Sequence, residues 1–157
     1  MINPLIGIHA ALGELGSILF LWVAIELFNP TDKRIKRAKF VALLGFLFLF
    51  LSWIIGGYYY VKFYGPDVKP LIKESSASWA HLIVMETKEH VFLLLPVLSI
   101  LTYFMIKNSK NELLKNNKLK NSVVTLSILI FLIGMSMAFM GYLISSAARL
   151  ALEVKVL

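Results

Sequence analysis

Residues 78–106 read SWAHLIVMETKEHVFLLLPVLSILTYFMI, a stretch long enough for one helix to cross a lipid bilayer. Its second half is apolar, whereas its first half carries five ionisable side chains: His81, Glu86, Lys88, Glu89 and His90. An ionisable group at membrane depth costs about 2.5–3.5 kcal/mol on insertion scales, so such groups usually mark a ligand, ion or proton site. The stretch therefore predicts a membrane span whose first half holds a functional site.

Three other apolar segments extend this prediction to the whole chain, which has 157 residues and is 59% hydrophobic. These segments of membrane-crossing length occupy residues 4–28, 40–61 and 122–148. Pro30 ends the first segment. Pro66 is expected to break the helix after the second segment, so that residues 62–77 form a polar connection. Pro96 predicts a bend in the segment over residues 78–106. Because short connections favour antiparallel neighbours, the sequence predicts an all-α, integral membrane four-helix bundle with up-down-up-down topology, a single domain over residues 1–157.

The basic residues gather in two of the loops. The net charge is +7, and residues 29–39 and 107–120 each carry five Lys or Arg against a single acid. The positive-inside rule places both loops in the cytoplasm and both chain termini on the outer or periplasmic side, as in a bacterial or archaeal cytoplasmic membrane. Basic loops between apolar spans, unlike the basic patch of a nucleic-acid-binding fold, indicate contact with a lipid bilayer and no nucleic acid.

Two other features suit the membrane interface. Glu26 lies at the end of the first span beside a basic loop, so its side chain is expected to reach the headgroups. The aromatic cluster after the second span, Tyr58, Tyr59, Tyr60, Phe63 and Tyr64, is typical of the headgroup level.

The heights of the three histidines follow from the helical rise of about 1.5 Å per residue. His9 precedes Asn29 by 20 residues, or about 30 Å, and His90 precedes Lys107 by 17, or about 25 Å. His9 and His90 therefore lie at similar heights, whereas His81 lies at or above the outer interface. His81 and His90 are nine residues apart and point to opposite sides of a straight helix. Either the helix is irregular before Glu86, or one of these histidines faces a loop or a partner subunit.

These positions are compatible with a haem between the first and third spans. His9 and His90 would be its axial ligands, and His81 a further ligand or a partner of a haem propionate. Gly13 and Gly16 share a helix face with His9, and such small residues suit the approach of a flat porphyrin. The fourth span carries a similar stripe: Ser127, Gly134, Ala138, Gly141, Ser145 and Ala148. Such stripes also arise from ordinary packing of membrane helices.

Arg149, near the outer level, could pair with a haem propionate. With no cysteines in the chain, disulfides, iron–sulfur clusters, Cys-ligated zinc and Cys-attached haem are excluded.

A second constellation competes with the haem. Glu86 and His90 are four residues apart and face the same way. With His9, and Glu14 or Glu89, they could bind zinc, iron or manganese, or they could relay protons in a transport or sensor protein. No H-E-x-x-H or glycine-rich nucleotide motif is present, so a hydrolytic enzyme is not expected.

The pattern resembles small four-helix bacterial membrane proteins often described as predicted b-type cytochromes. The matching residues are Pro4-Leu5-Ile6-Gly7-Ile8-His9 at the start of the first span and Glu89-His90-Val91-Phe92 in the third. The resemblance implies haem b and electron transfer to a quinone or a redox partner protein. Asn3 stands where a further histidine would be typical, so a second haem depends on His81. Polar groups on one face of the third span suggest a homodimer.

Overall fold

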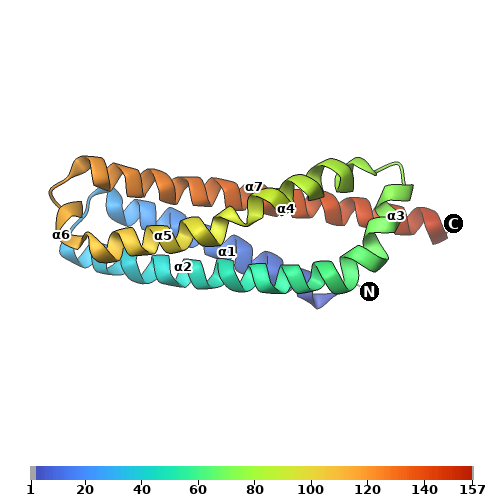
Figure 1. The fold of residues 1–157 in the computed structure, drawn as a ribbon, viewed down its shortest axis with the longest axis horizontal. Coiled ribbons are helices and arrows are strands. Elements are labelled where there is room, and N and C mark those ends of the chain that lie inside the picture. The colour runs from blue at the N-terminus through green and yellow to red at the C-terminus, as the bar shows by residue number, and fades with distance from the viewer. Residues whose placement is uncertain (1–2, 157) are drawn as a thin grey trace.

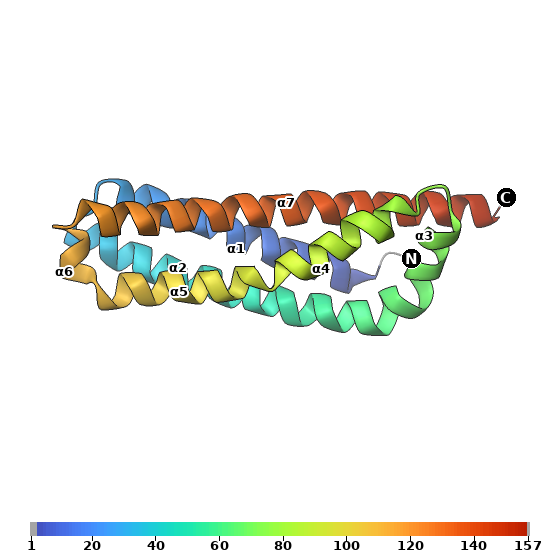
Figure 2. The same cartoon turned by 45° about the horizontal axis from the view of Figure 1, so that its top comes forward.

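The computed structural model describes residues 3–156, and all of the regular structure in this range is helical. Four helices are long and apolar enough to cross a membrane: Pro4–Phe28, Asp32–Glu74, Ala80–Asn108 and Asn117–Val154. They lie side by side, and successive long helices run in opposite directions (Figure 1). Both views place the two ends of the chain at one end of the bundle and the short helix α6 (Lys110–Leu113) at the other (Figure 2).

Helix α1 (Pro4–Phe28) and helix α2 (Asp32–Tyr59) form an antiparallel pair joined by a three-residue turn. The Asn3 side chain accepts a hydrogen bond from the Leu5 amide at 3.0 Å, and Pro4 follows in the first turn, where its missing N–H costs nothing. Thr31 caps α2 in the same way, accepting from the Arg34 amide at 3.3 Å. These caps set where both helices begin.

The second long helix does not end at Pro66, so the predicted polar connection over residues 62–77 is wrong for most of its length. The chain continues from α2 into a π-helical segment, η1 (Tyr60–Val68), and then into α3 (Lys69–Glu74), which crosses the end of the bundle (Figure 1). A proline inside a helix removes one hydrogen bond and bends the axis. The wide π turn around Pro66 absorbs this change, and the helix bends instead of stopping.

The third long helix is interrupted close to Pro96, as predicted. A π-helical segment, η2 (Ala80–Met85), leads into α4 (Glu86–Phe92), and α5 (Leu94–Asn108) follows after a break at Leu93. Pro96 has no N–H to donate to the carbonyl of Phe92 four residues earlier, which explains the position of the break. The helix is also irregular before Glu86, which was one of the two arrangements that the histidine spacing allowed.

The fourth long helix, α7 (Asn117–Val156), extends beyond the expected end at residue 148. Residues 149–154 contain neither glycine nor proline, so nothing in the local sequence stops the helix there.

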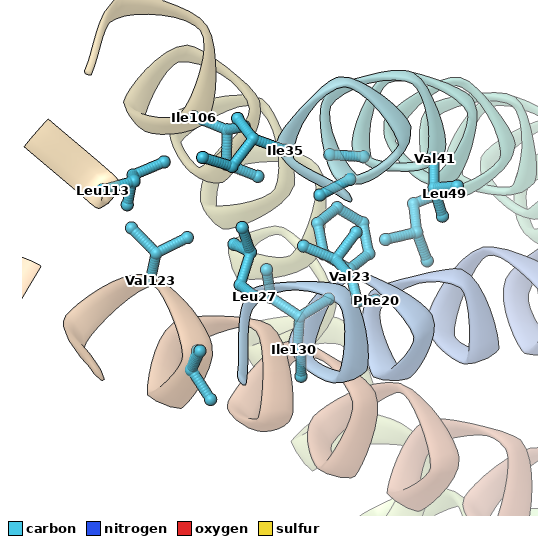
Figure 3. Packing of buried hydrophobic residues seen from close by; sticks show 14 of the residues in the cluster. Phe20, Val23, Leu27, Ile35, Val41, Leu49, Ile106, Leu113, Val123 and Ile130 are labelled. Carbon is cyan, nitrogen blue, oxygen red and sulfur yellow. The ribbon is translucent and has the colours of Figure 1, made fainter. Parts of the chain in front are cut away.

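The core is built where the long helices face one another. Helix α1 packs against α2 and α7, and α5 packs against the same two helices from the other side. Figure 3 shows this core near the turns, where side chains from all of these helices meet: Phe20, Val23, Leu27, Leu49, Ile106 and Ile130. Buried hydroxyls within it bond to carbonyls of their own helix, as Ser99 does to Pro96 and Ser127 to Val123, both at 2.8 Å.

The outward faces are apolar as well. Phe28, Phe40, Val97 and Phe139 are each more than 60% exposed, on four different helices. Apolar surface on all sides of a bundle requires an apolar surrounding, because in water such faces would associate. The protein is therefore an integral membrane protein with four spans in contact with the lipid bilayer.

Candidate functional site

His9 links α1 to α2. Its Nδ1 lies 2.8 Å from the carbonyl oxygen of Ser52 and 3.0 Å from the Ser52 hydroxyl, which itself donates to the His9 carbonyl at 2.8 Å. Since a carbonyl only accepts, Nδ1 carries the ring proton and Nε2 keeps its lone pair. The ring lies against Gly56, where a Cβ would come within 2.6 Å of Nδ1, and the Phe92 ring meets it edge-on at 6.0 Å. His9 is thus held between three helices.

His90 has a similar local bond but a different environment. Its Nδ1 donates to the Glu86 carbonyl at 2.6 Å, so Nε2 again carries the lone pair, and the side chain is exposed on α4. His90 lies two positions from Phe92, or about 200° around the helix. It therefore lies on the opposite face of α4 from the ring that touches His9. The structure does not bring His9 and His90 together.

His81 is buried, with 1% of its surface exposed, and its two nitrogens face different partners. Nδ1 lies 3.0 Å from the hydroxyl of Tyr64, and Nε2 lies 3.6 Å from Glu86 Oε1. Tyr64 is itself buried, although its sequence context suggested the headgroup level, and its ring stacks on Tyr60 at 5.3 Å. Three segments, η1, η2 and α4, thus meet at one imidazole.

Two more charged side chains, Lys88 and Glu89, follow Glu86 on α4. Among the described residues, Glu89 Oε1 is the buried side-chain oxygen that has no hydrogen-bond partner. Lys88 reaches α7, where its Nζ lies 3.2 Å from the position that a Cβ on Gly141 would take. We call Tyr64, His81, Glu86 and Glu89 the polar cluster.

The polar cluster lies close to an open pocket. Gly65, the residue after Tyr64, lines a hollow of about 490 Å³ together with Lys69, Pro70, Lys73 and Glu74. The Glu86 side chain is 46% exposed, so the chain of contacts from Tyr64 through His81 ends at an accessible carboxylate. An imidazole between a hydroxyl and a carboxylate can accept a proton at one nitrogen and release one from the other.

The other predicted site residues lie apart from the polar cluster. Glu14 is exposed on α1, and Arg149 is exposed on α7, where its Nε donates to the Ser145 carbonyl at 3.3 Å. The space left by Gly13 and Gly16 is occupied by α2: a Cβ on Gly13 would lie 3.1 Å from Ser52 Oγ. Over residues 3–156, no three His, Asp or Glu side chains come together in a way that could hold a metal ion. The predicted zinc or iron set is therefore not assembled here.

The contacts of Ser52 with His9 and of Tyr64 with His81 were not predicted from the sequence. Tyr60 and Tyr64 are four residues apart and share a helix face, which was an available signal. Comparison of the chain with protein-family models, with curated proteins and with solved structures finds no significant match.

Proposed function

We propose that this protein carries protons across the membrane through the polar cluster. The observation that carries the proposal is the position of His81, buried between the Tyr64 hydroxyl and the Glu86 carboxylate. Histidine is the side chain whose ordinary pKa lies nearest neutrality, and burying an ionisable group in protein costs free energy unless it has polar partners. The polar cluster shares Glu86 with the set His9, Glu14, Glu86 and His90 that the sequence suggested.

The proposed orientation follows from charge. The connections at residues 29–31 and 109–116 lie among basic residues. The positive-inside rule assigns such connections to the cytoplasm. Both termini, η1 and the polar cluster then face the outside or periplasm, giving an up-down-up-down topology in a bacterial or archaeal cytoplasmic membrane. In this orientation the open pocket lined by Gly65 and Lys69 faces the outer solution.

Proton flux into proteoliposomes tests this proposal. With a potassium-driven membrane potential and a pH-sensitive dye inside, we expect wild-type protein to carry protons and Tyr64→Phe to reduce the flux by about tenfold or more, because it removes the hydroxyl beside His81. Tyr142→Phe is the matched control, since Tyr142 is 62% exposed on α7. Equal flux for wild type, both variants and protein-free vesicles would refute the proposal.

A b-type cytochrome is the second candidate, favoured by the bonds of His9 and His90. In both residues a backbone carbonyl holds Nδ1–H and leaves the Nε2 lone pair available, which is the usual arrangement of a metal-bound histidine. The donor chemistry fits a haem b, but His9 is packed against Ser52 and Gly56 of α2 and meets the Phe92 ring of α4. His9 and His90 would therefore hold haem at separate places, and an exposed imidazole at membrane depth favours a homodimer as the source of a second ligand.

Bound haem would supply one-electron transfer, to a quinone or a redox partner protein. A visible spectrum of the detergent-solubilised protein, oxidised and then reduced with dithionite, decides between the two candidates. In the cytochrome, His90→Ala and His9→Ala are each expected to lower the haem content, whereas His81→Asn leaves it unchanged because both nitrogens of His81 already face protein groups. A blank spectrum from cells with adequate haem would exclude this candidate.

A further inference from the structure

A groove on the surface of α1 lies at the opposite end of the bundle from the polar cluster. The groove has a volume of about 390 Å³. Its apolar walls come from α1 and α7: Leu21, Ala24, Ile25, Phe28 and Ile128. Its polar end is formed by Asn29 and Arg34, at the turn into α2. Ile25 and Phe28 are 56% and 66% exposed, so the groove opens toward the membrane.

Arg34 is held at the mouth of the groove with hydrogen-bond donors to spare. Its Nε donates to Glu26 Oε2 at 3.0 Å, and its Nη2 donates to the Ile25 carbonyl at 2.5 Å. A guanidinium has five N–H groups, so these two bonds leave three for another acceptor. The Arg34 side chain is 28% exposed, which makes those donors accessible from outside.

The surrounding charge favours an anion. Close to Arg34 in the sequence are three exposed lysines: Lys33, Lys36 and Lys39. The nearby acids are already paired: Asp32 with Lys110 at 2.7 Å, and Glu26 with two arginines. The basic side chains therefore leave an excess of positive charge beside an apolar surface.

We infer that this groove binds a phospholipid with an anionic headgroup. The phosphate accepts hydrogen bonds from Arg34, and an acyl chain lies along Ile25, Phe28 and Ile128. Basic pockets between membrane helices are a usual site for anionic lipid headgroups. The combination of a membrane-facing apolar wall with a fixed guanidinium at its end matches a lipid better than a free anion, which would make no use of the wall.

Native mass spectrometry of protein released from nanodiscs of equal phosphatidylglycerol and phosphatidylcholine tests the inference. Wild-type protein is expected to retain phosphatidylglycerol in preference to phosphatidylcholine, and Arg34→Gln to reduce this preference by about fivefold. Arg37→Gln is the matched control, because Arg37 also binds Glu26 but does not line the groove. Phe28→Ala is expected to weaken retention, whereas Phe40→Ala, which changes an equally exposed phenylalanine elsewhere, is not.

Several results would overturn the inference. One is equal retention of the two lipids, and another is an equal loss in Arg34→Gln and Arg37→Gln, which would assign the effect to the Glu26 ion pairs. Displacement of the bound lipid by inorganic phosphate would indicate a free-anion site instead. If Arg34→Gln retains the wild-type preference for phosphatidylglycerol, the Arg34 guanidinium does not bind the headgroup.

Discussion

Replacing Glu26 with alanine is expected to destabilise the folded protein by about 2–3 kcal/mol, because it leaves two arginines without their shared carboxylate. Glu26 is 6% exposed, although its position suggested a side chain that reaches the headgroups. Its carboxylate accepts from Arg34 Nε at 3.0 Å, from Arg37 Nε at 2.9 Å and Nη2 at 3.0 Å, and from Trp22 Nε1 at 3.1 Å. These bonds tie the end of α1 to the beginning of α2.

The expected loss is below the value for a fully buried ion pair. The Arg34 and Arg37 side chains are 28% and 56% exposed, so both can regain water or lipid headgroups when the carboxylate is removed. Thermal or denaturant unfolding in detergent measures the change. Glu112→Ala is the control, since Glu112 is exposed and makes no ion pair in the described structure. If both variants unfold alike, the Glu26 bonds do not stabilise the fold.

Replacing Gly16 with valine is expected to cost about 3 kcal/mol, at the upper end of typical overpacking effects. A Cβ at Gly16 would lie 3.1 Å from the backbone nitrogen of Leu49 and 3.2 Å from the backbone carbonyl of Gly45. Backbone atoms of a neighbouring helix cannot turn aside as a side chain can. The valine therefore has to push α1 away from α2, which also strains the contact between His9 and Ser52.

Gly134→Val is expected to act similarly between α7 and α1, because a Cβ there would overlap Ser17, which is fully buried. Gly7→Val and Gly57→Val are the matched controls, since a Cβ at either position has no atom within 4 Å. Unfolding in detergent should show both controls close to wild type. An equal stability of Gly16→Val and Gly7→Val would contradict the close approach of α1 and α2.

The amino-acid sequence alone predicts the membrane class, the four apolar helices, the break near Pro96 and the polar first half of the third long helix. Each of these depends on local properties: apolar length, a missing N–H, or charge within an apolar stretch. Ordinary packing of membrane helices was one of the two interpretations of the small-residue stripes. Gly16, Gly45 and Gly134 do lie at helix contacts, a result consistent with that interpretation.

Which side chains contact one another depends on how the helices pack together. The helical rise gives the height of His9 and His90, but it does not give the direction in which each side chain points. That direction depends on how each helix is rotated against its neighbours and on the π turns of η1 and η2, which insert an extra residue and turn the following side chains. For this reason His81, assigned to the outer interface by its height, is buried against Tyr64, whereas His90 is exposed.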